Sequence, residues 1–295
     1  MQLRLVRYFV ALARLQHFAR AAQACGVTQP TLSAGLITLE EQVGARLIIR
    51  DRRYIGLTPE GEAMLPWAQQ MVAASESMMQ AAEVVRGPLS GELRIGSIPA
   101  AMTATGQFTR AVLAEHETLT VSVRSSTSRE IEFGLGNFEL DAGLTYLDHE
   151  PPSSVLKVPL YFESYMFVTH AEGPHRERRS IGWAEAVSTP LCLLHQGMQN
   201  RRILDSRLAA RGLVLRPRTV ADSYVGLLAM VRAGGLSTII PDSYAPLVPE
   251  HSWARILPFD DPVESSRIGL IVLDRSPLSA LAAAALATAR TLTLT

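Results

Sequence analysis

The chain has 295 residues, 47% of them apolar, and its 28 basic and 28 acidic side chains give a formal net charge of zero. This length exceeds that of a usual single domain, and the apolar content is enough for sizeable buried cores. A neutral chain has no overall attraction to nucleic acid or membranes, and its two cysteines, Cys25 and Cys192, are too far apart in sequence to indicate a zinc site or a disulfide framework. Residues 1–60 nonetheless hold eight arginines against four acidic residues, a net of +4 that predicts an anion-binding module.

Neither end of the sequence has the pattern of a targeting or membrane segment. The residues after Met1 form an amphipathic run that contains arginine and has no apolar signal-peptide core. The alanine-rich stretch 278–295 is interrupted by Arg290 and is too weakly apolar to cross a bilayer. We therefore expect a cytoplasmic protein in a reducing compartment, with no membrane partner.

Three helices are predicted near the N-terminus, over residues 4–15, 18–25 and 28–44. Gly26 ends the second helix and the third begins shortly after it, which is the helix-turn-helix pattern. Thr28 is suited to cap the third helix, Pro30 fits its first turn and Gly44 can end it. Residues 45–58 then contain two strand-like pieces around an arginine-rich turn, as a β-wing would.

The third helix has two contrasting faces. Its apolar stripe repeats at helical spacing and consists of Leu32, Leu36, Ile37, Leu39 and Val43. The opposite face begins with short, uncharged side chains, those of Gln29, Thr31, Ser33 and Ala34. We expect the stripe to be buried in a core and the polar face to be solvated unless a partner covers it.

One long helix is predicted from Thr58-Pro59 to about Arg86. Small or apolar residues recur along it in alternate steps of four and three, which is a heptad seam: Leu57, Gly61, Met64, Ala68, Met71, Ser75, Met78, Ala82 and Val85. The length of the seam favours pairing with a second copy of the chain, the alternative being an amphipathic helix on its own core. Pro66 removes a backbone donor and is expected to bend the helix.

From Gly91 onward, strand-like runs alternate with helical ones. The strands are predicted at 92–98, 119–126, 140–146, 163–170, 190–197, 236–241 and 267–274. The helices are predicted at 105–116, 128–137, 200–212, 223–235 and 278–290. Such alternation predicts an α/β architecture with a parallel sheet.

A dense set of residues between positions 18 and 65 matches a known signature: Phe18, Ala21-Ala22, Gln29-Pro30, Ser33, Leu39-Glu40, Val43-Gly44, Arg46-Leu47, Arg50 and the run Leu57 to Gly61. Weaker matches follow in order, in "GELRIG", "LGNFELDAGL" and "VRAGGLSTIIP". Together these stretches resemble the LysR-type transcriptional regulators, and the resemblance extends along the whole chain.

The resemblance implies a fold that combines α and α/β parts: an N-terminal winged helix-turn-helix, a long linker helix for dimerisation, and an effector domain like the periplasmic binding proteins. The corresponding domains are residues 1–58, 59–88 and 91–295. The effector domain would have two α/β lobes, lobe I at about 91–160 and 268–295 and lobe II at about 161–267. Two segments, near Val158–Ser164 and Glu264–Asp274, would cross between the lobes.

In this family, the positions that match Gln29, Pro30 and Ser33 approach DNA, which would give the polar helix face a role. Short donors and acceptors can read base edges in the major groove, and the Pro30 ring or the Thr31 methyl group can touch a thymine methyl. The wing would contact the DNA backbone or the minor groove through Arg50, Arg52 and Arg53. The dipeptide Ala34-Gly35 departs from the many members that have a basic residue here, and its glycine weakens the helix by about 1 kcal/mol relative to alanine.

Ligands of open α/β sheets bind at the carboxyl ends of the strands, where helix N-termini present free N–H groups. This rule places the candidate effector site on Ser97, Ile98, Pro99, Ala100, Thr127, Ser128, Thr145, His195, Gln196 and Met198. Hydroxyl groups and helix N-termini favour a small organic anion, and the family often senses carboxylates. Each serine or threonine has helix capping as its alternative role, and Pro99-Ala100 departs from members that have a hydroxyl residue at this turn.

These features predict a sequence-specific DNA-binding transcriptional regulator that a small, anionic metabolite controls. The expected partners are double-stranded DNA, further copies of the chain in a homodimer and homotetramer, and RNA polymerase. No catalytic constellation, metal site or cofactor site is recognisable, and an intrachain disulfide switch is not expected because Cys192 has no resolving cysteine in its own domain. Two alternatives stay open: a DNA-binding protein with a vestigial or ligand-independent effector domain, and an enzyme or transporter-type domain whose N-terminal module is only an oligomerisation arm.

Overall fold

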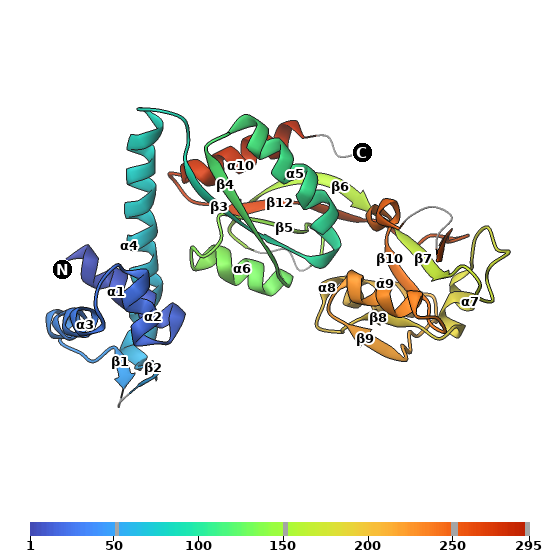
Figure 1. Ribbon diagram of the computed structural model, residues 1–295, viewed down its shortest axis with the longest axis horizontal. Coiled ribbons are helices and arrows are strands. Elements are labelled where there is room, and N and C mark those ends of the chain that lie inside the picture. Colours follow the sequence, from blue (N-terminus) through green and yellow to red (C-terminus); the bar gives the residue numbers. More distant parts are fainter. Residues whose placement is uncertain (51–52, 150–152, 249–252, 293–295) are drawn as a thin grey trace. The chain divides into compact units, whose positions relative to one another are not determined.

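A computed structural model describes residues 1–50, 53–149, 153–248 and 253–292 (Figure 1). The chain divides into two compact units, Met1–Pro88 and Leu89–Thr295. Each has its own hydrophobic core, and each is described by itself below.

The N-terminal unit is a helix-turn-helix followed by a two-stranded wing and one long helix (Figure 1). Its elements are α1 (Leu3–Leu15), α2 (Phe18–Ala24), α3 (Gln29–Val43), β1 (Ile48–Arg50), β2 (Tyr54–Leu57) and α4 (Pro59–Val84). Strands β1 and β2 pair antiparallel. The three N-terminal helices, the wing and the long helix are therefore confirmed as predicted.

Helix α3 begins and ends through the local signals expected of it. The Thr28 hydroxyl oxygen accepts a hydrogen bond from the Thr31 backbone N–H, and Gly44 ends the helix with a left-handed φ of 78°. The predicted apolar stripe is only partly buried, because Ile37 is 45% exposed and Val43 is 40% exposed. The remaining members of the stripe, Leu32, Leu36 and Leu39, form the buried face of α3 together with a carboxylate described below.

Gly35 lies where helix α1 approaches α3 closely. A Cβ atom added to Gly35 would lie 2.7 Å from the Tyr8 ring and 3.2 Å from the Leu5 side chain. Such distances are sterically forbidden or strained. Close packing of α1 against α3 therefore requires a glycine at this position, despite the low helix propensity of glycine. The sequence pattern alone did not reveal this contact.

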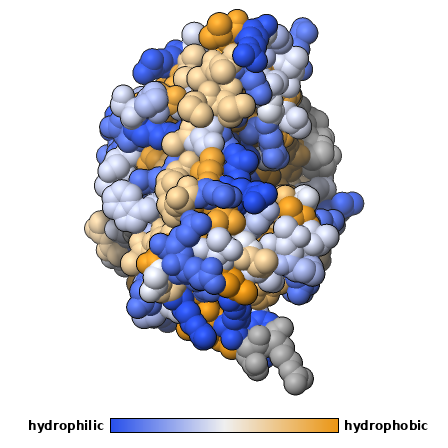
Figure 2. All heavy atoms as spheres, turned by 90° about the vertical axis from the view of Figure 1, so that its left-hand side faces the viewer, coloured by the Kyte–Doolittle hydropathy of each residue, from blue (hydrophilic) through white to orange (hydrophobic). Residues whose placement is uncertain are grey.

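Helix α4 starts at a threonine cap and continues unbroken through Pro66. The Thr58 hydroxyl oxygen accepts from the Gly61 backbone N–H at 3.0 Å. Early seam residues pack on the unit's own core, where Gly61 and Ala68 are buried. Farther along the same helix Met78 is 66% exposed and Val85 is 88% exposed. The seam therefore has two parts, one covered by the helix-turn-helix core and one at the surface. Figure 2 shows apolar residues scattered among hydrophilic ones on the face of the molecule that it draws.

The first lobe of the second unit is built on a five-stranded sheet in the order β4-β3-β5-β12-β6. The strands are β3 (Gly91–Ser97), β4 (Leu119–Ser125), β5 (Ala142–Tyr146), β6 (Val155–Glu163) and β12 (Ser266–Leu273). Helices α5 (Met102–Glu115) and α10 (Ala280–Thr291) pack together against the sheet, and α6 (Ser128–Gly136) covers its other side (Figure 1). A short 3-10 helix, Pro99–Ala101, precedes α5.

The prediction of a parallel sheet is correct only for part of this lobe. Strand β3 pairs parallel with β4 and β5, whereas β12 pairs antiparallel with both β5 and β6. The physical reason is the chain path, since β6 leaves the lobe and β12 returns to it after a long excursion. Helical crossovers connect β3, β4 and β5, and they make these three strands parallel, with β3 between the other two.

The second lobe contains a three-stranded antiparallel sheet and a parallel pair. Its strands are β7 (Tyr165–His170), β8 (Cys192–Leu194), β9 (Thr219–Ala221), β10 (Thr238–Pro241) and β11 (Ala254–Pro258), and its helices are α7 (Trp183–Ser188), α8 (Gln199–Ala209), α9 (Tyr224–Arg232) and a 3-10 helix at Asp242–Leu247. Elements α7, β9 and β11 were not predicted, because they are too short for a clear periodicity. One apolar cluster includes residues of both lobes, so their cores are continuous.

Candidate DNA-binding surface and effector cleft

The polar face of helix α3 is exposed where the sequence predicted it. Gln29, Pro30 and Thr31 are exposed, and Ser33 is half-buried. The Thr31 hydroxyl is 2.8 Å from the Thr28 hydroxyl, so Thr31 also takes part in the cap. Donors, acceptors and a methyl group are thereby presented on the first turns of a helix, the arrangement that reads base edges in a major groove.

A buried carboxylate joins α3 to the wing. Glu40 accepts hydrogen bonds from the backbone N–H groups of Leu47 at 3.0 Å and Ile48 at 3.2 Å. Its second oxygen accepts from Arg50 Nη2 at 3.0 Å. Arg50, predicted as a DNA contact, is therefore engaged in an ion pair that holds the wing, which is a structural role the sequence did not indicate.

The structure describes only one of the other two arginines predicted in the wing. Arg53 is exposed at the turn between β1 and β2. The prediction for Arg52 lies outside the described residues. An exposed guanidinium at the tip of a β-wing has the reach and the charge to meet a phosphate group.

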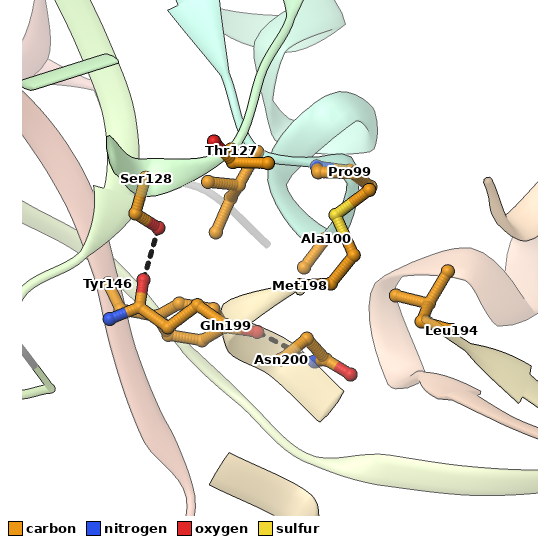
Figure 3. Close-up of a pocket in the computed structure, with 10 residues that line it drawn as sticks. Pro99, Ala100, Thr127, Ser128, Tyr146, Leu194, Met198, Gln199 and Asn200 are labelled. Carbon is orange, nitrogen blue, oxygen red and sulfur yellow. Dashed lines mark hydrogen bonds between the residues drawn. The ribbon is translucent and has the colours of Figure 1, made fainter. Parts of the chain in front are cut away.

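The structure brings most of the predicted effector residues together at one pocket in the second unit (Figure 3). Of its lining residues, six were predicted from the carboxyl ends of the strands: Ile98, Pro99, Ala100, Thr127, Ser128 and Met198. Both lobes contribute, and the space between the side chains is about 10 Å³. That is room for one water molecule at most, so the cleft is closed in this conformation.

Four predicted residues do not line the pocket. Ser97 is fully buried, and its hydroxyl lies 2.8 Å from the Thr105 hydroxyl inside lobe I. His195 and Gln196 are exposed, because the turn after β8 carries them outward before helix α8 starts. Thr145 is buried behind the pocket and donates to the Ser128 hydroxyl oxygen at 3.1 Å.

Four lining residues were missed: Tyr146, Leu194, Gln199 and Asn200. Tyr146 and Leu194 are the last residues of β5 and β8, so the strand-end rule could have found them. Gln199 and Asn200 are the first residues of α8, where side chains at a helix N-terminus face the cleft. Both residues could have been found from the start of helix α8, but the sequence analysis predicted that this helix begins at residue 200, one residue too late.

Gln199 bridges the two lobes. It is 5% exposed, and its side-chain oxygen accepts a hydrogen bond from the Ser128 hydroxyl (Figure 3). Its side-chain nitrogen donates to the backbone oxygen of His149 at 2.5 Å. Ser128 and His149 belong to lobe I, whereas Gln199 begins α8 in lobe II. The amide of Gln199 thus fills the polar end of the cleft.

A second bridge lies at the point where the chain crosses between the lobes. Glu163 ends β6 and is fully buried, and its Oε1 accepts from the Tyr146 hydroxyl at 2.8 Å and from Asn200 Nδ2 at 3.0 Å. Its Oε2 is buried without a hydrogen-bond partner among the described residues. Burial raises the pKa of the Glu163 carboxyl to about 8, so the group is mostly protonated at neutral pH.

The two helix N-termini at the cleft differ in how they are capped. At α6, Thr127 and Glu130 form a capping box in which the Glu130 carboxylate accepts from the Thr127 backbone N–H. At α8, the cap residue Met198 provides no side-chain hydrogen bond. A negative charge is already present at α6, so an anionic ligand is better accommodated by the N–H groups of α8.

The described residues include no group of three or more histidine, cysteine or acidic side chains that could hold a metal ion. Within the same ranges, no helix combines the length and apolar character needed to span a membrane. The two candidate sites are thus a polar helix face beside a wing in one unit, and a closed cleft with mixed apolar and polar lining between the two lobes of the other.

This arrangement is that of a transcription regulator that binds DNA through a winged helix-turn-helix and has a separate ligand-binding domain. Residues 3–62 match the bacterial regulatory helix-turn-helix protein, lysR family, and residues 86–293 match the LysR substrate binding domain. The chain belongs to the LysR family of transcription regulators. It is a DNA-binding regulator and not an enzyme.

Relatives support this assignment over nearly the whole chain. A "probable hydrogen peroxide-inducible genes activator" of Mycobacterium avium is 32% identical over 268 residues, which cover 90% of this chain and 86% of that protein. The "DNA-binding transcriptional dual regulator OxyR" of Escherichia coli K12 is 27% identical over 283 residues, 94% of this chain and 91% of that protein.

Solved structures share the fold. A full-length OxyR variant of Pseudomonas aeruginosa has a TM-score of 0.74 with 25% sequence identity, and the match covers 99% of both chains. CbnR in complex with its target DNA has a TM-score of 0.71 at 22% identity, again over 99% of both chains. At this identity the CbnR likeness supports the fold alone.

Proposed function

We propose that this protein couples the binding of a small polar effector in the cleft between its two lobes to the reading of DNA by helix α3 and the wing. The observation that carries the proposal is the cleft itself, which residues of both lobes line and hydrogen bonds bridge. A ligand that enters there must change those bridges, and a ligand that binds two conformations unequally shifts their populations. Such a regulator would act in the cytoplasm, where chromosomal DNA is accessible.

The effector is proposed to be a small metabolite with at least one hydrogen-bond acceptor, an organic anion being favoured at α8. The uncapped N-terminus of α8 supports this, since free N–H groups and the helix dipole attract negative charge. The carboxylate of Glu130 at α6 opposes a second negative group on that side. The negative group of the ligand would therefore contact α8, while the uncharged Ser128 hydroxyl would bind a polar group elsewhere on the same ligand.

On the DNA side, Gln29 and Ser33 are proposed to read base edges, with Pro30 and Thr31 touching thymine methyl groups. Arg53 is proposed to contact phosphate, while Arg50 acts mainly through its ion pair with Glu40. This division of roles agrees with the exposure of each side chain.

The exposed part of α4 is proposed to pair with the same helix of a second chain and so to form a homodimer. Contacts between effector domains are proposed to join two such dimers into a homotetramer. Met71, Met78 and Val85 are seam residues that are 40%, 66% and 88% exposed in the single chain. Burial of such side chains contributes roughly 25 cal/mol per Å² of apolar surface. The buried early part of the seam shortens the stretch available for this pairing.

The names of several relatives raise peroxide sensing as a second candidate function, but the thiols of this chain give it little support. Cys192 is fully buried, and burial raises the pKa of its thiol to about 11. At pH 7 roughly one such thiol in ten thousand is ionised, and the thiolate is the form that peroxide oxidises. Cys25 belongs to the other unit, and burial raises its pKa as well. We expect peroxide to leave DNA binding unchanged, and Cys192→Ser to behave as wild type.

The test uses the full-length protein, a panel of small organic acids and the DNA upstream of its own gene. We expect at least one acid to raise the melting temperature and to change DNA affinity in a gel-shift titration. Ser128→Ala should weaken that acid about tenfold, because one hydrogen bond in the cleft is lost, and should change ligand-free DNA affinity much less than ligand affinity. Ser125→Ala is the matched control, an exposed serine outside the cleft lining. If no acid binds, or if Ser128→Ala alters DNA affinity as much as ligand affinity, the vestigial-cleft alternative replaces the proposal.

A further inference from the structure

We propose that the cleft contains a socket for a carboxamide group, which Gln199 fills from within the chain and which a carboxamide of the effector fills in its place. The socket is formed by the Ser128 hydroxyl, supported by Thr145, and by the backbone oxygen of His149. This inference rests on the proposed function and names the chemical class of its effector.

The direction of each hydrogen bond in the socket is set by its neighbours. Thr145 donates to the Ser128 oxygen at 3.1 Å, which leaves the Ser128 proton to point at Gln199. The backbone oxygen of His149 can only accept, so it must face the amide nitrogen of Gln199. The socket therefore presents one donor and one acceptor side by side.

This pattern discriminates between ligand groups. A carboxamide brings an acceptor and a donor on one carbon, and it satisfies both partners as Gln199 does. A carboxylate brings two acceptors, so one oxygen would face the His149 oxygen without a proton between them. A buried acceptor left without its donor costs roughly 1–3 kcal/mol, which corresponds to about a fivefold to hundredfold loss of affinity.

The position of Gln199 makes the socket a link between the lobes. Gln199 begins α8 in lobe II, while the socket groups lie on lobe I. With Gln199 in place the cleft has only about 10 Å³ of free space, so no effector fits beside it. A carboxamide that replaces Gln199 releases one hydrogen-bonded contact between the lobes, which gives the ligand the differential effect on conformation that a switch requires.

The experiment empties the socket and refills it from solution. Gln199→Ala removes the amide and the methylene group that carries it, and acetamide supplies these missing atoms as a free molecule, with acetate as its charged counterpart of equal size. Melting temperature and calorimetry on the full-length chain measure binding. In Gln199→Ala we expect acetamide to raise the melting temperature by about 2–5 °C at ten times its Kd, and acetate to bind at least tenfold more weakly. Wild type should bind acetamide at least tenfold more weakly than Gln199→Ala does, because its own tethered amide competes for the socket and a fragment has no other contacts in the cleft. Gln196→Ala, which changes an exposed glutamine in the same turn, should behave as wild type.

Two results overturn the inference in distinguishable ways. If acetate binds Gln199→Ala as well as acetamide does, the socket is an anion site, and the proposed effector function stands without the carboxamide. If neither binds, there is no socket, and the organic-acid panel then decides the proposed function separately.

A second variant covers the case in which Gln199→Ala does not fold. Gln199→Glu has the same size, and its protonated carboxyl again offers one donor and one acceptor. Its melting temperature should match wild type near pH 4 and fall below it as pH rises and the carboxyl ionises. Equal melting temperatures of Gln199→Glu and wild type at pH 8 would refute the socket.

Discussion

Replacing Glu40 by alanine removes the one carboxylate that three donors of the wing share. Two of them are the backbone N–H groups of Leu47 and Ile48, residues that are 1% and 3% exposed, and the third is the Arg50 guanidinium. A buried N–H group left without an acceptor costs about 1–3 kcal/mol, so the two together predict a loss of about 2–6 kcal/mol. Arg50 is partly exposed and adds at most about 1 kcal/mol, since solvent can replace its partner.

Glu40→Gln separates the hydrogen bonds from the charge. Glutamine keeps an oxygen for the two N–H groups and loses the ion pair with Arg50, so we expect a cost of about 1–2 kcal/mol. Urea unfolding of the full-length protein, followed by circular dichroism and calorimetry, measures both variants, and Glu41→Ala is the control at an exposed neighbour. DNA affinity should fall with the wing's loss of position. The reasoning is refuted if Glu40→Ala costs less than about 1 kcal/mol, or if the glutamine variant loses as much as the alanine variant.

Three further predictions concern the other sites. Ser33→Ala should lower affinity for a specific operator by about 1–3 kcal/mol, whereas Arg53→Ala should weaken binding to all DNA sequences alike and reduce its salt dependence. DNA titrations at several salt concentrations measure both effects, and a Ser33→Ala variant that weakens specific and random DNA equally would contradict these roles. Glu163→Gln should stabilise the protein most at pH 8 and least at pH 5. Burial raises the pKa of Glu163 from 4.5 to about 8, so the stability of the wild type falls as pH rises through that window, and glutamine avoids this loss. Parallel pH profiles of the melting temperatures of variant and wild type would contradict the prediction. Gly61→Ala should destabilise the N-terminal unit by about 1–3 kcal/mol, since its Cβ would lie 2.1 Å from the backbone oxygen of Leu47. The control Gly106→Ala, which places its Cβ in open space on α5, should stabilise the protein by about 0.5–1 kcal/mol. A Gly61→Ala variant as stable as wild type would show that the wing moves away without cost.

Local chemistry explains which parts of the fold were predictable. Helix α3 begins at Thr28 and ends at Gly44, and α4 begins at Thr58, because each cap is formed by residues within a few positions of it. The helix-turn-helix, the wing and the long helix follow from such signals. The same applies to the strand ends that form the cleft, since Ser128 and Met198 were reachable by a rule about where strands end.

Contacts between distant residues decided the rest. The sequence pattern did not show that Glu40 would accept from Arg50 and the wing, that Gly35 leaves room for the Tyr8 ring, or that half of the seam on α4 would be covered by its own core. Nor did it show Gln199 reaching across to Ser128, which is 71 residues earlier in the chain. Amino-acid order sets the caps, the periodicity and the family signature because these depend on neighbouring residues, whereas the partner of a buried polar side chain depends on which segments the folded backbone brings within hydrogen-bond distance.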